Sequence, residues 1–201
     1  QEKINMYKIA VLASTNGTDL QAIIDEIQAG KMEGIELSVV ISNKKNCNAL
    51  KRAKEYGYEA HFVDPKGKTR EIFDNEMIEI LLKKKINLIV LVGYMRILSA
   101  NFVKTFKNKI INIHPAIDLV KYGGAGFFGG NVHKAVLNAC EKESGCTIHI
   151  VAEDVDSGPI LAQAKVKIDQ DETEASLKEK VQTAEKKLYP EVIRKFAKEE
   201  L

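Results

Sequence analysis

Short apolar runs rich in β-branched residues alternate with helical patterns along this 201-residue chain. The runs predict seven strands, at 7–13, 36–42, 59–63, 86–93, 109–114, 146–151 and 160–168. Between them, apolar residues recur at spacings of three and four, as on one face of a helix. The helical segments are 19–29, 48–56, 69–84, about 99–106, 131–142 and 173–197. Strand–helix alternation predicts an α/β domain with a mostly parallel central sheet flanked by helices.

The composition is that of an ordinary globular domain, with 45% hydrophobic and 29% charged residues. We predict an N-terminal extension at 1–6 and one domain over 7–201. A formal net charge of +2, with both signs interspersed, argues against a nucleic-acid partner. No apolar run reaches the about 18 residues of a membrane span, and the polar start does not resemble a signal peptide. Cys47, Cys140 and Cys146 form no CxxC pair, which predicts free thiols in a reducing cytoplasm.

The longest irregular stretch, 115–130, has a length that suggests a functional loop. Its residues 124–129 read GAGFFG and fit the GxGxxG pattern of dinucleotide-binding turns. That pattern requires its first glycine at the end of a strand, whereas Gly124 comes ten residues after the strand end at His114. We therefore predict no nicotinamide site. We interpret residues 124–129 as a movable flap whose Phe127 and Phe128 exclude water.

The first predicted strand runs directly into a helix through the turn 14–21, STNGTDLQ. Free backbone N–H groups and the helix dipole favour an anion at such a helix start. One phosphate monoester fits beside Asn16, Gly17 and Thr18. The alternative is a tight turn in which Thr18 or Asp19 is the N-cap, and the residues alone favour neither interpretation. The carboxylate of Asp19 repels a phosphate unless it points away.

Asn112 and His114 lie two residues apart at the carboxyl end of an apolar strand, so their side chains share one face. An amide beside an imidazole can stabilise a developing oxyanion and move a proton. Asp156, before Ser-Gly-Pro in a loop after another strand, could orient His114 and favour its imidazolium form. The alternative interpretations are a buried polar pair that satisfies loop backbone, and ordinary turn chemistry for Asp156.

The other histidines have structural interpretations. His149 alternates with Thr147 along a strand, which indicates a hydrogen-bonded core histidine. His133 opens a helix as a cap or loop contact, and His61 lies on a short strand. Because no HxH or HExxH spacing occurs, we predict no metal site.

Seven collinear segments, from about Tyr7 to the last helix, match one known family. They are the turn STNGTDLQAI, the strand and turn LVGYMRILS, NIHP, the helix start VHKAVL, the strand SGCTIHIV, the loop VDSGPI and the late helix VQTAEKKLYP. Through them the chain resembles the phosphoribosylglycinamide formyltransferases, the folate-dependent GAR transformylases of purine synthesis. The resemblance covers nearly the whole chain and implies a Rossmann-like formyltransferase fold.

The resemblance implies transfer of a formyl group from 10-formyltetrahydrofolate to the amine of glycinamide ribonucleotide, without metal or nicotinamide. These two small molecules are the expected partners of a monomer or homodimer that binds neither nucleic acid nor membrane. The implied catalytic residues are Asn112, His114 and Asp156. The implied ribonucleotide residues are Asn16, Gly17, Thr18, Asp19, Gln182 and Glu185. The implied folate residues are Met95, Arg96, Leu98, Ala152, Glu153, Asp154 and Val155.

This sequence departs from the family pattern in three places. The turn has Thr15 where a small residue is common and Asp19 where Asn is frequent. Segment 116–121 reads AIDLVK and lacks a second proline, and the following loop carries extra glycines. These positions bear on phosphate affinity and on the approach to the folate.

Four alternatives share parts of this pattern. Three are formyl-folate enzymes: methionyl-tRNA formyltransferase, formyltetrahydrofolate hydrolase and sugar-nucleotide formyltransferases. The first two normally carry an additional domain, and a sugar nucleotide leaves Gln182 and Glu185 without their implied role. The fourth is a nucleotide-binding module without catalysis, for which the set of Asn112, His114 and Asp156 has no need.

Overall fold

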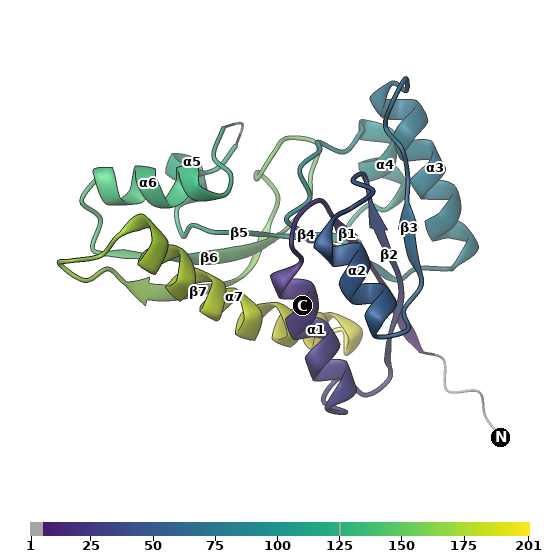
Figure 1. The fold of residues 1–201 in the computed structure, drawn as a ribbon, viewed down its shortest axis with the longest axis horizontal. Coiled ribbons are helices and arrows are strands. Elements are labelled where there is room, and N and C mark those ends of the chain that lie inside the picture. Colours follow the sequence, from purple (N-terminus) through teal and green to yellow (C-terminus); the bar gives the residue numbers. More distant parts are fainter. Residues whose placement is uncertain (1–5, 125) are drawn as a thin grey trace.

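The computed structural model describes residues 6–124 and 126–201. Within them, seven strands form one sheet in the order β3-β2-β1-β4-β5-β6-β7 (Figure 1). The strands are β1 Tyr7–Ala13, β2 Ile35–Ser42, β3 Ala60–Phe62, β4 Leu88–Val92, β5 Ile110–His114, β6 Glu143–Ile150 and β7 Ile160–Lys167. Neighbours from β3 to β5 run parallel, while β6 is antiparallel to both β5 and β7. The mostly parallel sheet is confirmed. Of the predicted extension, residues 1–5 lie outside the described residues.

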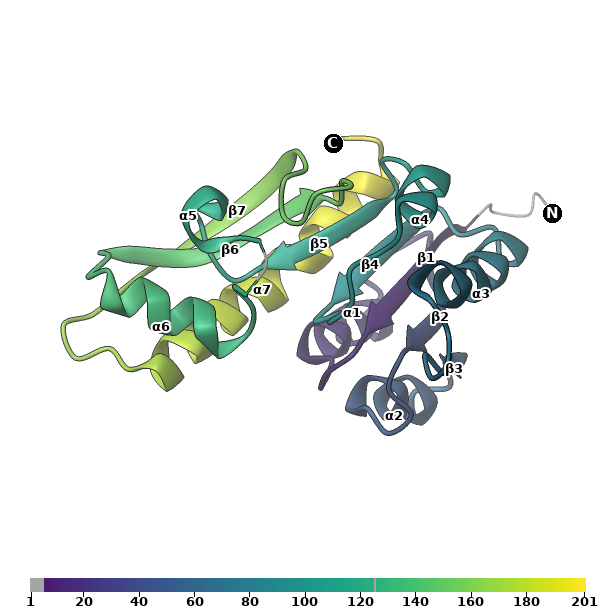
Figure 2. The same ribbon diagram turned by 90° about the horizontal axis from the view of Figure 1, so that it is seen from above.

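Helices cover both faces of the sheet, as the view from above shows (Figure 2). They are α1 Thr18–Gln28, α2 Asn48–Glu55, α3 Arg70–Lys83, α4 Ala100–Thr105, α5 Leu119–Tyr122, α6 Gly130–Asn138 and α7 Glu174–Ala197. Two hydrophobic cores lie on the two faces of the sheet. Helices α1, α2, α6 and α7 pack into one core, and α3 and α4 pack into the other. Among the described residues, no helix combines the length and apolar character that crossing a membrane requires.

The two cores follow from side-chain alternation along the central strands. In β1, Ile9, Val11 and Ala13 join the core under α1 and α7. Ala10 and Leu12, in between, join the core under α3 and α4. Successive side chains of a strand point to opposite faces, so a strand covered on both faces is apolar throughout. This explains the unbroken apolar runs in the sequence.

Several helices are capped by the first residue of the segment that the sequence predicted. The hydroxyl of Thr69 accepts the N–H of Ile72 at the start of α3, and that of Ser99 accepts the N–H of Phe102 at the start of α4. At α7 the cap is Thr173, which forms a capping box with Ser176. The side-chain acceptors satisfy N–H groups that lack a partner within the helix, and so fix where each helix begins.

The structure differs from the sequence prediction inside the stretch 115–130. A short helix, α5, begins at Asp118, whose carboxylate accepts the backbone N–H of Lys121 at 2.9 Å. A helix of this length adds too few apolar repeats to show periodicity in the sequence. Ala125 of the predicted flap lies outside the described residues, and the movement of the flap stays a prediction.

Candidate active site

A cavity of about 440 Å³ opens where β4 and β5 end. In α/β sheets, ligands bind beyond the carboxyl ends of the parallel strands. The cavity is lined by residues within 91–98, 112–115, 124–129 and 149–156, which include the catalytic and folate residues named from the sequence: Met95, Arg96, Leu98, Asn112, His114, Ala152, Glu153, Asp154, Val155 and Asp156. Residues far apart in the sequence therefore meet at one cavity.

Each nitrogen of the His114 imidazole faces an oxygen atom. His114 ends β5 and is 4% exposed. Its Nε2 lies 2.6 Å from the carbonyl oxygen of Tyr122 in α5. A carbonyl oxygen only accepts, so Nε2 carries the hydrogen in this contact. Nδ1 lies 3.5 Å from Oδ2 of Asp156 and faces the carboxylate.

Asp156 joins three segments of the site. Its Oδ2 accepts the backbone N–H of Gly124 at 2.9 Å, and its Oδ1 lies 3.3 Å from Nε2 of His149. The backbone of Asp156 has a φ of 53°, a conformation uncommon for a residue with a side chain. Burial raises the pKa of Asp156, but His149, the Gly124 N–H and His114 outweigh it, so the net pKa lies below its ordinary value. The carboxylate is therefore ionised and aimed at both histidines.

Asp156 raises the pKa of His114, in the direction that the sequence predicted, but burial opposes it. Burial lowers the pKa of His114, and His149 adds to the effect. Asp156 and the Tyr122 carbonyl raise it, yet the net pKa lies below the ordinary value. Desolvation of a cation in this buried position exceeds the attraction of one carboxylate. The free site thus holds a neutral imidazole.

His149 belongs to this site, although the sequence indicated only a core histidine. It pairs with Asn112 across the antiparallel β5–β6 ladder. Its Nδ1 lies 2.9 Å from the carbonyl oxygen of Ile150, and its Nε2 is 3.4 Å from Nδ2 of Asn112. The Ile150 carbonyl only accepts, so Nδ1 carries a hydrogen. Nε2 therefore donates to Asp156 when the ring is an imidazolium, and accepts from the Asn112 amide when the ring is neutral. Only the antiparallel pairing of β5 with β6 places His149 beside Asn112, and the apolar runs in the sequence do not reveal that pairing.

We expect His149→Phe to lower turnover more than it weakens substrate binding. The ring keeps its bulk, but Asp156 loses the partner of Oδ1, a loss of about 1–3 kcal/mol for a buried group. Asp156 and His114 then lose their fixed relative position. Steady-state kinetics separate the two effects, since kcat falls while KM stays within a few-fold. An equal rise of KM with unchanged kcat would contradict a positioning role.

The turn before α1 has an uncapped helix start. Gly17 occupies the N-cap position with a φ of 65°, and no side chain caps this end. The alternative with Thr18 or Asp19 as N-cap is therefore wrong. Arg52 Nε donates to the carbonyl oxygen of Asn16 at 2.8 Å, and Asn48 Nδ2 donates to the Asn16 side-chain oxygen at 2.9 Å. The backbone N–H groups of the first helical turn are left to meet an anion.

The turn is tied to the cavity wall. Ser14 Oγ accepts the backbone N–H of Met95 at 2.9 Å and donates to Oδ1 of Asn43 at 2.6 Å. A Cβ on Gly93 would lie 2.4 Å from Oγ1 of Thr15, so the two loops approach closely. The helix start that could hold an anion thus sits against the loop that lines the cavity.

We expect Gly17→Ala to weaken this helix start. An added Cβ would lie 2.9 Å from Cβ of Ala49, and the positive φ is strained for a side chain. The substitution should cost about 1–3 kcal/mol of stability. A thermal or urea unfolding curve checks the cost. Gly30→Ala is the matched comparison, because Gly30 also has a positive φ but nothing lies within 4 Å of its added Cβ. Equal losses in both variants would exclude the contact with Ala49 as a cause.

The other residues that the sequence predicts for the ribonucleotide do not line the 440 Å³ cavity. Asp19 is in the first turn of α1, and Gln182 and Glu185 lie on α7, which packs against α1 in the same core. Asp19 and Glu185 are buried, while Gln182 is half-buried. Asp19 and Glu185 are therefore buried on two helices that pack together, and none of the three residues lines the cavity around His114.

Among the residues that the sequence predicts for the folate, Arg96 packs its side chain against helix α3. Its guanidinium carbon lies 4.4 Å from the centre of the Phe73 ring, on α3. Met95, Phe128 and Val155 are exposed apolar side chains among the residues that line the cavity. The side chain of Arg96 is therefore anchored on α3, and the apolar wall comes from the other residues.

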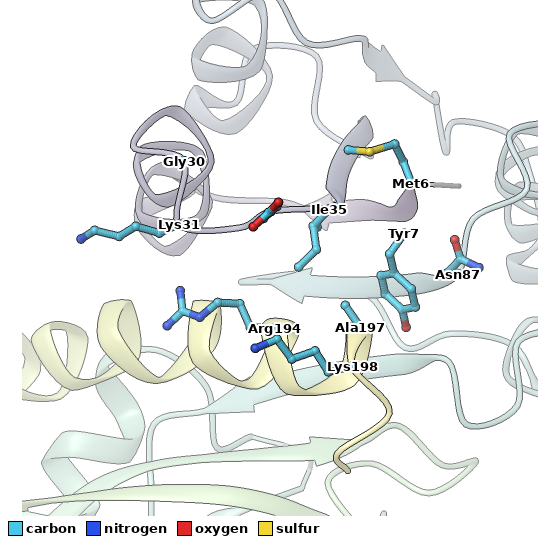
Figure 3. Close-up of a pocket in the computed structure, with 11 residues that line it drawn as sticks. Met6, Tyr7, Gly30, Lys31, Ile35, Asn87, Arg194, Ala197 and Lys198 are labelled. Atoms are coloured by element: carbon cyan, nitrogen blue, oxygen red, sulfur yellow. The ribbon is translucent and has the colours of Figure 1, made fainter. Parts of the chain in front are cut away.

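A second cavity, of about 500 Å³, lies at the opposite end of the parallel strands (Figure 3). It is lined by residues at the amino ends of β1 and β2 and at the end of α7, among them Tyr7, Ile35 and Arg194. The cations Lys31 and Arg194 both form ion pairs with Glu26. Because it lies at the amino ends of the strands, it is not the candidate active site, despite its larger volume.

The other histidines lie apart from the cavity lining. His133 is buried in α6, where Gly129 occupies the N-cap, so His133 is not the cap. His61 lies 2.6 Å from a carboxylate oxygen of Glu59 at the surface. Within residues 6–124 and 126–201, no three His, Cys, Asp or Glu side chains are grouped as a metal ion would require. Cys47, Cys140 and Cys146 are free thiols, as expected.

The chain is similar to known formyl transferases over most of its length. A family model described as formyl transferase matches residues 7–193. The phosphoribosylglycinamide formyltransferase of Escherichia coli is 37% identical over 190 residues, covering 94% of this chain and 86% of that protein. The glycinamide ribonucleotide transformylase 1 of Symbiobacterium toebii superposes with a TM-score of 0.89 at 35% identity, covering 96% of this chain and 89% of that one.

A longer relative contains a similar segment. The trifunctional purine biosynthetic protein adenosine-3 of Drosophila melanogaster is 40% identical over 189 residues, which is 92% of this chain but 14% of that protein. The shared segment is thus a unit that occurs both in short proteins and within a long one. On the family model and the Escherichia coli relative together, the chain belongs to the phosphoribosylglycinamide formyltransferase family of formyl transferases.

Proposed function

We propose that the chain transfers the formyl group of 10-formyltetrahydrofolate to the amine of glycinamide ribonucleotide, giving formylglycinamide ribonucleotide in purine biosynthesis. The carrying observation is the ionised Asp156 carboxylate held against His114, with Asn112 two residues earlier on the same strand, in one cavity. These are the groups that formyl transfer to an amine requires. The amine must lose a proton, and the formyl oxygen gains negative charge as the bond forms.

In this proposal each residue has a role that its position in the cavity supports. The amide of Asn112 donates to the formyl oxygen as its charge develops. His114 is neutral in the free site. It accepts the amine proton at Nε2 after the hydrogen that this nitrogen donates to the Tyr122 carbonyl has moved to Nδ1 beside Asp156, and it then passes the proton on. Asp156 orients the ring and stabilises the imidazolium that this step creates. His114 Nε2 donates to the Tyr122 carbonyl, so this proposal requires α5 to shift when substrate meets that nitrogen.

The two substrates occupy two parts of the site in this proposal. Met95, Arg96, Leu98, Ala152, Glu153, Asp154 and Val155 form the folate side, supported by the cavity that they line. The ribonucleotide phosphate meets the α1 start at Asn16, Gly17, Thr18 and Asp19, with Gln182 and Glu185 on α7 contributing further contacts. The uncapped first turn of α1 supports this placement. The enzyme is proposed to be cytoplasmic and to act as a monomer or homodimer.

The test is an absorbance assay for tetrahydrofolate release, run with and without glycinamide ribonucleotide. We expect release only when the ribonucleotide is present. Release without the ribonucleotide would indicate a hydrolase. Binding of both molecules without any product, measured by calorimetry, would indicate a binding module and contradict the proposal.

A further inference from the structure

Two carboxylates are buried on helices that pack together, one on α1 and one on α7. Asp19, in the first turn of α1, is 6% exposed, and Glu185, on α7, is 7% exposed. Oδ1 of Asp19 is buried and has no hydrogen-bond donor among the described residues. A buried carboxylate oxygen without a donor is costly when ionised. Asp19 follows directly on the Asn16–Thr18 turn.

The surrounding groups do not neutralise both charges. Lys186 on α7, exposed to solvent, is the cation whose charge acts on both carboxylates. The buried Tyr189 on α7 donates its hydroxyl to the carbonyl oxygens of Leu91 and Ile111, at 2.6 and 3.2 Å. The buried thiol of Cys146 on β6 feels the charge of Glu185 and Asp19. Arg52 on α2 is engaged by Asn16 and Gln21.

Two like charges in one buried contact cannot both be ionised at little cost. Burial raises the pKa of Asp19 to about 6, opposed by Lys186. Burial and the charge of Asp19 raise the pKa of Glu185 well above its ordinary value. Near neutral pH the lower-energy state holds a proton on the pair, and the two residues titrate together.

We propose that Asp19 and Glu185 share one proton, and that this shared proton couples phosphate binding at the start of α1 to proton uptake. The proposal rests on the assignment of that helix start to the ribonucleotide phosphate. A phosphate dianion beside Asp19 disfavours the ionised pair, so binding draws a proton in when the pair has lost it. The pair thereby removes the repulsion that an ionised Asp19 exerts on the ligand.

The unliganded protein provides the first test. A carboxyl group whose pKa is raised by folding stabilises least when it is ionised. The contribution of this pair to the stability of the wild type therefore falls as pH rises from about 4 through about 6. Asp19→Asn keeps the shape of the side chain and removes its ionisation. In urea unfolding, the free energy of unfolding of the variant relative to wild type should be higher at pH 8 than at pH 5. Glu185→Gln should give the same result, because either change removes the shared proton. A pH-independent difference for both variants would overturn the proposal.

The second test is calorimetric titration of glycinamide ribonucleotide at pH 6, 7 and 8 in buffers of different ionisation enthalpy. The phosphate and the amine of the free ligand have the same pKa values in every experiment. The difference between wild type and variant therefore reports the protons exchanged by Asp19 and Glu185. We expect the affinity of Asp19→Asn relative to wild type to rise about fivefold between pH 6 and pH 8, as follows if the ligand raises a pKa of about 6 by one unit. The wild type should take up more protons than the variant.

Asp25→Asn is the matched control. It removes a carboxylate from the exposed face of the same helix, where Asp25 accepts from Gln21, and should leave the proton uptake at the wild-type value. Equal uptake by wild type and Asp19→Asn would overturn the coupling. Absence of ribonucleotide binding by the wild type at every pH would overturn the proposed function and the coupling with it, while the unfolding experiment would still decide whether the proton is shared.

Discussion

Replacing His114 by alanine is expected to leave a folded protein whose formyl transfer is slower by about 100- to 10,000-fold, the usual contribution of a positioned acid–base group. His114 lines the cavity, and its ring faces the ionised Asp156. Alanine removes the group that accepts the amine proton. The ribonucleotide residues lie around α1 and α7, so ribonucleotide binding should persist. The assay of tetrahydrofolate release measures the rate, and calorimetry measures the binding.

The fold of this variant needs its own check, because His114 is buried. The substitution leaves the Tyr122 carbonyl without its donor, at a cost of about 1–3 kcal/mol. Circular dichroism and an unfolding curve should show a native state of lower stability. His61→Ala is the comparison, since His61 lies on the short edge strand β3 and pairs with Glu59 at the surface. Near-normal turnover by His114→Ala would exclude the mechanism.

The sequence predicted the elements well because burial on both faces leaves a plain signal. The run 86–93 contains β4, and the run 109–114 contains β5, within two residues at each end. Such strands need apolar residues at every position, and the helices between them keep one apolar face. The direction of a strand cannot be predicted in this way, because the same apolar run occurs in parallel and in antiparallel ladders. That is why the antiparallel pairing of β6 was not foreseen.

The same ambiguity hid part of the site. Asn112 and His114 could be paired from spacing alone, since side chains two apart on a strand share a face. Asp156 came from a loop and was carried by the family resemblance as much as by its turn. His149 required the ladder that sets it opposite Asn112, which only the folded sheet provides. The pKa of His114 required burial, a quantity that depends on α5 and on the loops over the cavity.

Asp156→Asn is expected to slow formyl transfer by about 100-fold or more, within the range for lost acid–base assistance. Asparagine keeps the size of the side chain and can still accept the N–H of Gly124, so the loop should hold its place. The charge beside His114 is lost. Asp156 is the largest influence that raises the pKa of His114 against burial, so the pKa falls further in the variant.

The pH profile distinguishes this effect from a general disturbance of the loop. His114 acts as a base in its neutral form, so activity is lost as pH falls through its pKa. A lower pKa therefore moves the acid limb of kcat/KM to lower pH, even as the maximum rate drops, because a weaker base remains neutral further into acid but accepts the amine proton less readily. Asp171→Asn, at an exposed position, should reproduce the wild-type profile. An acid limb that stays in place while the rate falls would mean that Asp156 acts on the substrate and not through His114.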